Sequence, residues 1–167
     1  MALRDAILPE YDHETSVTRR LLERVPPPPG SRWTPHSRSV SLGELAAHLA
    51  DIPRWLPRIV RGGGYDMAGT TGGAAARAHE TTEALLETFD RNVALGRESI
   101  AAADDGDLLA PWTLTSAGHV ALSTTRAYAL RRYVLNHLVH HRGQLTVYLR
   151  QSGLRVPSVC GPSADER

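Results

Sequence analysis

Residues 133–150 read Tyr-Val-Leu-Asn-His-Leu-Val-His-His-Arg-Gly-Gln-Leu-Thr-Val-Tyr-Leu-Arg, and this stretch decides the fold class. It is the centre of a longer helical pattern, 124–152, which closes at Gly153 and has Pro157 beyond it as a stop. A glycine just after the last turn and a proline shortly afterwards are typical of a helix end. The sequence therefore predicts one long, clearly bounded helix near the C-terminus.

Two histidines lie on the inward face of this predicted helix. At about 100° per residue, a sector of about 80° holds six residues that would face the interior. They are Leu130, Val134, His137, His141, Leu145 and Tyr148. A spacing of four residues brings His137 and His141 onto successive turns, so both imidazoles can reach one ion. His140 lies about 100° from the centre of this face, and we leave it out of the candidate site.

The spacing of His137 and His141 alone has two interpretations. Buried imidazoles cost free energy unless each has a partner, and a metal ion would supply that partner while keeping them neutral. Hydrogen-bonded core histidines would show the same spacing. Between the two histidines stand Leu138, Val139 and His140, so the glutamate base of a His-Glu-x-x-His metalloprotease is missing and that class is excluded.

Three further helices are predicted before this one, from apolar residues that recur at three- and four-residue steps. The prolines of 26–29 must end the first helix, because proline lacks the amide donor. Ser41 and Glu44 form a capping box at the start of the second helix. The four predicted helices cover residues 2–25, 41–61, 76–103 and 124–152.

Long connections separate the predicted helices. Pro53 and Pro57 are expected to kink or break the second helix. Residues 62–75, rich in glycine, threonine and alanine, form a linker that we expect to be mobile, and 107–123 read as a loop. Four helices without a convincing strand predict an all-α fold, a four-helix bundle forming a single domain over residues 1–167, with long loops after helices one, two and three.

Composition excludes several functional classes. The 167 residues are 41 % hydrophobic and 22 % charged, and no apolar run is long enough to span a membrane. A formal net charge of +1 gives no basic field, so we expect neither a nucleic-acid nor a membrane partner. All nineteen basic residues are arginines, and the absence of lysine excludes Schiff-base enzymes and P-loop nucleotide binders.

Cysteine usage and the N-terminal residues bear on the expected compartment. Cys160 is the only cysteine, which excludes an internal disulfide and a cysteine metal cluster. Residues 1–12 contain acids and lack the basic start, long apolar middle and cleavage site of a secretion signal. These features predict a cytoplasmic protein.

The pattern as a whole resembles the DinB family of metal-binding four-helix bundles, from the first helix to the C-terminus. The residues that carry the resemblance are Glu14, the segment Ser41-Leu42-Gly43-Glu44-Leu45-Ala46-Ala47-His48, the segment Asn136-His137-Leu138-Val139-His140-His141-Arg142-Gly143-Gln144-Leu145, the residues Tyr148-Leu149-Arg150 and the tail Gly161-Pro162-Ser163-Ala164-Asp165-Glu166. Related sequences often carry tyrosine before Gly-Pro-Ser, where this chain has Cys160, and this departs from the family pattern.

This resemblance implies a metal site of three histidines. In the family, one histidine of the second helix and two of the fourth, four residues apart, hold a divalent ion whose other positions are left to water. The matching residues here are His48, His137 and His141. Three imidazoles accept zinc, nickel, iron, copper and manganese, and of these we expect zinc or nickel.

Two functions remain open at this stage, and no catalytic side chain is identified. Three neutral imidazoles leave the full charge of the ion and an open position, which favours an enzyme that acts on a small molecule, as a hydrolase or a low-molecular-weight-thiol transferase. The family resemblance includes thiol-dependent transferases and isomerases as well as hydrolases. The alternative is a non-catalytic metal-binding or stress-response protein in which the ion is structural or sensory.

Several other side chains carry weaker expectations. Glu14 lies on the inward face of helix one, where its carboxylate would be paired with a neighbour or would accept a hydrogen bond from an imidazole. Asp51 is expected to face solvent. Three tryptophans are expected to cover the core: Trp33, Trp55 and Trp112.

A second apolar row predicts a homodimer. On the long C-terminal helix, Leu135 and Val139 lie about 110° to 150° from the centre of the histidine face, with Thr146 between them in angle. A bundle helix with one buried face would carry charges at these positions. A two-fold contact with a second copy would explain the row.

Overall fold

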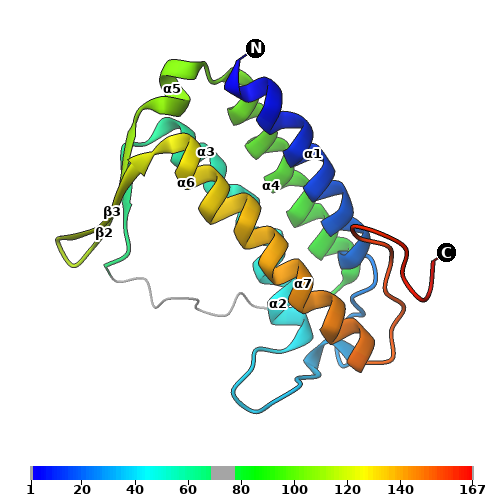
Figure 1. The fold of residues 1–167 in the computed structure, drawn as a ribbon. Coiled ribbons are helices and arrows are strands. Elements are labelled where there is room, and N and C mark those ends of the chain that lie inside the picture. Colours follow the sequence, from blue (N-terminus) through cyan, green and yellow to red (C-terminus); the bar gives the residue numbers. More distant parts are fainter. Residues whose placement is uncertain (1, 69–77, 167) are drawn as a thin grey trace.

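A computed structural model describes residues 2–68 and 78–166 of the chain (Figure 1). Its α-helices are α1 Leu3–Leu22, α2 Leu42–Asp51, α3 Trp55–Arg61, α4 Thr82–Ala102, α5 Asp105–Leu109, α6 Arg126–Leu130 and α7 Asn136–Gln151. Its strands are β1 Gly64–Asp66, β2 Pro111–Ser116 and β3 His119–Thr125. Among these described residues, no helix combines the length and apolarity needed to cross a membrane.

The four predicted helices correspond to α1, α2 with α3, α4, and α6 with α7. Ser41 caps α2, because its hydroxyl accepts from the amide of Glu44 at 3.2 Å while the Glu44 carboxylate accepts from the amide of Ser41 at 2.7 Å. The predicted break of the second helix is confirmed, since a short 3-10 turn that contains Pro53 separates α2 from α3.

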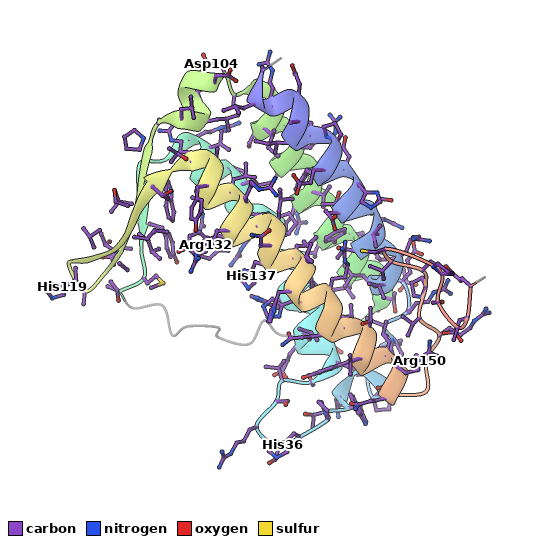
Figure 2. All side chains as sticks on the ribbon, in the orientation of Figure 1. His36, Asp104, His119, Arg132, His137 and Arg150 are labelled. Carbon is purple, nitrogen blue, oxygen red and sulfur yellow. The ribbon has the colours of Figure 1, made fainter. Side chains whose placement is uncertain are left out.

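Four long segments enclose the core. Figure 1 shows α1 and α4 side by side, with α6 and α7 following one another across from them and α2 packed near α7. Apolar side chains fill the space between these segments (Figure 2). The largest fully buried side chains include Trp112, Tyr11 and Phe89. Trp33 and Trp55 are partly buried against this core, as expected, whereas Trp112 lies within the core instead of covering it.

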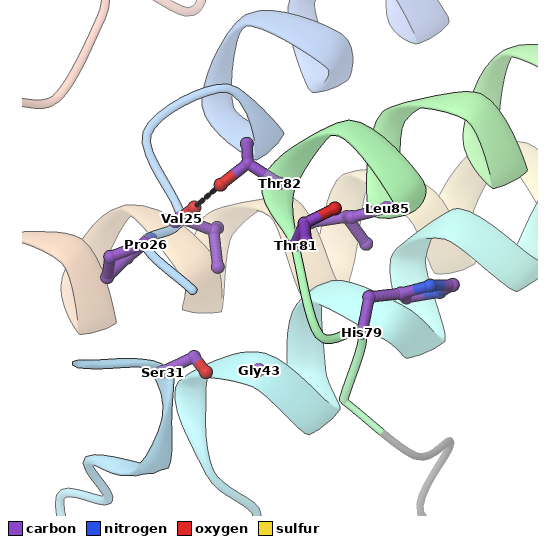
Figure 3. Close-up of a pocket in the computed structure, with 8 residues that line it drawn as sticks. All are labelled: Val25, Pro26, Ser31, Gly43, His79, Thr81, Thr82 and Leu85. Carbon is purple, nitrogen blue, oxygen red and sulfur yellow. Dashed lines mark hydrogen bonds between the residues drawn. The ribbon is translucent and has the colours of Figure 1, made fainter. Parts of the chain in front are cut away.

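The start of α4 is tied to the loop that follows α1. The hydroxyl of Thr82 donates to the carbonyl of Val25 at 2.8 Å, beside a small pocket that His79 and Ser31 also line (Figure 3). This hydrogen bond satisfies a loop carbonyl of the kind that helix ends leave unpaired. It therefore ties the start of α4 to the end of the first helical segment.

The all-α prediction is wrong in one region, where a three-stranded sheet lies beside the bundle. β1 pairs in parallel with β2, and β2 pairs in antiparallel with β3. The range 107–123, predicted as a loop, instead holds the end of α5 and most of this hairpin. Ala117 and Gly118 form the two-residue turn with positive φ angles of 49° and 80°, the geometry that matches the twist of paired strands.

β1 also lies in the predicted linker 62–75, so the first part of that linker is strand rather than loop. Residues 69–75, the rest of the linker for which mobility is expected, lie outside the described residues. The fold is thus a mostly helical bundle with a small sheet at one end, near α3 and α6 (Figure 1).

A π-helical turn, Arg131–Leu135, joins α6 to α7. A π turn holds about one residue more than an α turn, so the positions on either side of it are rotated relative to regular helical spacing. Val134 and Leu135 are therefore both buried, with exposed fractions of 0 % and 2 %. The prediction that Leu135 lies on the outer face is wrong for this reason.

Candidate metal centre

Three imidazoles from two helices meet at one point. His48 lies near the end of α2, and His137 and His141 lie on successive turns of α7. Figure 2 labels His137 on α7. His48 Nε2 is 3.2 Å from His137 Nε2, which is 2.8 Å from His141 Nε2. Each of the three residues offers one nitrogen, and these nitrogens all lie within 4.8 Å of one another.

These distances suit a single divalent ion. Metal–nitrogen bonds of about 2.0–2.1 Å with ligand angles of about 90–110° place ligand nitrogens about 2.8–3.4 Å apart. The separation of 3.2 Å between His48 and His137 falls inside this range, and the 2.8 Å between His137 and His141 lies at its lower end. Three histidines in such close proximity could hold a metal ion.

A hydrogen bond on the far side of the His141 ring orients it toward this point. Nδ1 of His141 lies 2.7 Å from Oε1 of Gln144, and because the amide oxygen only accepts, Nδ1 carries the proton. The lone pair of His141 is then on Nε2, the atom that faces the other histidines. The backbone of Tyr133 also interacts with His137 and partly raises its pKa.

Gln144 was not predicted as a site residue. It follows His141 by three residues, and this spacing on a helix is the signal that could have found it. The predicted inward face of α7 also needs a correction. The buried side chains of α7 are Leu138, Arg142, Leu145 and Leu149. His137 and His141 are half-buried and lie at the edge of this buried face.

The surroundings keep the three imidazoles neutral. Burial, followed by the neighbouring His141 and His137, lowers the pKa of His48 to about 4. Burial is also the main cause that lowers the pKa of His137 and that of His141, although hydrogen bonds to Tyr133 and Gln144 partly oppose it. A metal ion binds only the neutral form of imidazole, so the site is in its binding form at neutral pH.

The same shifts predict how the metal-free protein responds to acid. The unfolded chain protonates its histidines near their ordinary pKa of about 6.5, whereas folded His48 resists protonation down to about 4. Stability is therefore complete above the unfolded pKa and decreases as the pH falls toward the folded pKa. We expect the urea midpoint, measured in chelator, to fall between about pH 7 and about pH 5.

His48→Gln removes the most shifted imidazole and is the matched variant for this titration. Its urea midpoint should depend less on pH than that of the original protein over the same range. Equal slopes for both proteins would show that the triad does not cause the loss of stability.

Other candidate residues do not join the three histidines. His140 is exposed, with its ring centroid 4.8 Å from that of His141. Asp51 is only partly exposed, and its carboxylate lies 4.0 Å from Arg54. Cys160 is exposed in the C-terminal segment. None of these side chains is among the three that could hold an ion.

Glu14 makes the paired contact that was one of its two predicted roles. Its carboxylate forms an ion pair with Arg142, and its backbone carbonyl accepts from Nη1 of the same arginine at 3.2 Å. The alternative, a hydrogen bond from a site imidazole, is absent among the described residues. Arg142 was not predicted to have a role, although it directly follows His141.

Comparisons with known proteins agree with this fold. A DinB-like protein from Bacillus cereus ATCC 10987 superposes with a TM-score of 0.70 at 20 % identity, over 95 % of this chain and 97 % of that one. The DinB-like protein YjoA from Bacillus subtilis superposes with a TM-score of 0.64 at 18 % identity, over 97 % of this chain and 99 % of that one. At these identities the likeness concerns the fold alone.

Sequence comparison identifies the family. The uncharacterized protein YrdA of Bacillus subtilis (strain 168) is 47 % identical over 38 residues, a match that spans 23 % of this chain and 23 % of the length of that relative. The sequence model of the DinB family matches residues 5–166. Because that match covers almost all of its length, the chain belongs to the DinB family.

Proposed function

We propose that the protein binds one divalent metal ion through His48, His137 and His141 and uses it in chemistry on a small molecule. The convergence of three Nε2 atoms at separations of 3.2 and 2.8 Å is the observation that carries this proposal. Zinc and nickel are the ions we expect, with iron, copper and manganese as alternatives.

The donor set favours a catalytic over a closed structural site. An ion with three neutral ligands keeps its double charge and at least one open position, and it can lower the pKa of water or of a thiol toward neutrality. The proposed reaction classes are therefore hydrolysis and the addition of a low-molecular-weight thiol to an electrophile. Both use a small-molecule substrate, and the proposed location is the cytoplasm.

Three carboxylates of α1 and α2 already have partners among the described residues. The Glu44 carboxylate is held by Ser41, and that of Glu14 by Arg142. Asp51 faces Arg54. Because each of these three carboxylates already has a partner, proton transfer in the proposed reaction would depend on solvent or on the substrate itself.

This shortage of free acids favours a second candidate function. In this second function, the ion stabilises the contact between α2 and α7, and the protein acts as a non-catalytic metal-binding or stress-response protein. Turnover assays separate the two functions. The metal-loaded protein would be assayed with activated esters and, separately, with a thiol and an electrophile. His137→Ala is the matched control for both assays. Turnover that is lost in this variant supports the enzyme, and binding without turnover supports the second function.

Removal of the metal is expected to lower the thermal midpoint without unfolding the bundle. A chain of this size buries a large apolar core, so its fold does not depend on the ion. An ion present at about 100 times its dissociation constant adds roughly 2.7 kcal/mol to the stability. Metal analysis of the purified protein should give one ion per chain, and circular dichroism with and without chelator would follow the midpoint. Complete loss of the helical signal in chelator would contradict this expectation.

A further inference from the structure

The side chain of Ser31 carries a buried hydroxyl for which the described residues offer no hydrogen bond. Ser31 lies in the 3-10 turn Gly30–Arg32 that precedes α2, and its exposed fraction is 2 %. Native proteins pair nearly all of their buried polar groups, because a buried hydroxyl without a partner loses its hydrogen bonds to solvent without replacement. The Ser31 hydroxyl therefore needs a partner outside these residues.

A small pocket adjoins this hydroxyl, where four segments of the chain meet (Figure 3). Its walls come from the loop after α1, the turn that holds Ser31, and the starts of α2 and α4. About 10 Å³ of the pocket is open to the centre of a water-sized molecule. One ordered water needs at least about 10–15 Å³ by this measure. The pocket therefore matches a single water molecule in size.

Gly43 gives the pocket its space at the start of α2. A Cβ atom at this position would lie 2.7 Å from Cβ of Ala78 and 3.1 Å from Oγ of Ser31. Any side chain here would therefore crowd the Ser31 hydroxyl. As the second residue of α2, Gly43 also has an amide that no turn of its own helix can pair. Because Gly43 lines the pocket, this unpaired donor belongs to the pocket wall.

Two threonines at the start of α4 add further polar groups to the wall. The Thr82 hydroxyl gives its hydrogen to the carbonyl of Val25 at 2.8 Å, so its oxygen can still accept a hydrogen bond. The Thr81 hydroxyl accepts from the amide of Ala84 at 3.1 Å, so its hydrogen can still be donated. A buried water typically makes about three hydrogen bonds. Together with Ser31, the wall offers that many partners.

The charges around the pocket favour a neutral guest over an anion. The starts of two long helices border the pocket, and a helix N-terminus attracts negative charge. Each of these helices already has an acid in its first turn, Glu44 in α2 and Glu83 in α4. These carboxylates answer the positive ends of the two helices, so the pocket itself has little attraction left for an anion.

We propose that one ordered water molecule binds in this pocket and pairs with the Ser31 hydroxyl. It joins the turn before α2 to the starts of α2 and α4, three segments that are far apart in the sequence. The proposal is independent of the histidine centre, because none of the three histidines lines the pocket. It can therefore be tested on metal-free protein.

Ser31→Ala gives a test by the direction of its effect on stability. If a water pairs with the hydroxyl, the variant loses hydrogen bonds, and its thermal midpoint should fall by roughly 1–6 °C. If the hydroxyl has no partner, its removal relieves a cost, and the midpoint should rise. Thermal unfolding followed by circular dichroism measures the shift. A higher midpoint for Ser31→Ala would overturn the proposal.

The water itself can be observed in two ways. A high-resolution crystal structure should show an oxygen within about 3.2 Å of the Ser31 Oγ. In solution, the amide of Gly43 should give a nuclear Overhauser effect to a long-lived water, and Ser31→Ala should abolish it. Ser152→Ala is the matched control, because it removes another buried hydroxyl without a partner, one that does not line this pocket, and it should leave the effect unchanged. Bromide in the pocket after a soak, or no ordered oxygen beside Ser31, would overturn the proposal.

Discussion

We expect His137→Ala and His141→Ala each to abolish stoichiometric metal binding. The Nε2 of His137 lies 3.2 Å from that of His48 and 2.8 Å from that of His141, so His137 is the central one of the three proposed ligands. Loss of either imidazole of α7 leaves only two nitrogens for the ion. Loss of a residue that merely orients a metal ligand already weakens binding by about 10–100-fold, and loss of the ligand itself should exceed this. Metal content after dialysis and titration calorimetry would measure the effect.

His140→Ala is the matched control, because it removes an imidazole of the same helix that is exposed and does not face the other nitrogens. This variant should retain one ion per chain. All three variants should have the same thermal midpoint in chelator as the original protein. This result would show that the loss of metal binding does not come from unfolding. Equal loss of metal in all three would reject the assignment of ligands by helical position.

The largest loss of stability is expected from Arg142→Met. The side chain of Arg142 is 4 % exposed and that of its partner Glu14 is 19 % exposed, and the two tie α7 to α1. Methionine fills much of the same space but leaves the Glu14 carboxylate buried without its charge partner. Breaking a buried ion pair from one side costs about 3–5 kcal/mol, which corresponds to a thermal midpoint roughly 6–20 °C lower. Thermal and urea unfolding of the metal-free protein would measure it.

The double variant Glu14→Gln and Arg142→Met tests the cause of this loss. It removes both charges, so it should recover a large part of the stability that Arg142→Met loses. A double variant as unstable as Arg142→Met alone would show that the packing of the arginine, rather than its pairing, accounts for the effect.

The sequence predicted the long helices and the convergence of His137 with His141, because both rest on local periodicity, which side chains on one face of a helix obey wherever the helix lies. The spacing of His137 and His141 identified two nitrogens that converge, but it could not decide whether a third would join them. That His48 lies beside them depends on how α2 packs on α7, and it was predicted through the family resemblance alone.

Two errors arose where the local pattern was weak or interrupted. In the hairpin, Trp112 and Leu114 alternate with polar residues and face the interior, but the turn of Ala117 and Gly118 lacks the asparagine or aspartate that usually marks such a turn. The π turn before α7 rotated Leu135 into the core. A single extra residue in one helical turn leaves no periodic signal, so angles calculated for a uniform helix fail there.

The separation of the three histidines along the chain sets the order of events during folding. His137 and His141 share one helix and can meet as soon as it forms, whereas His48 is 89 residues away from His137. Closing so long a loop is entropically costly, and contacts of this kind form late on the folding pathway. The three imidazoles therefore come together only when α7 docks on α2. If all three hold the proposed ion, its tight binding would report that the native topology is complete.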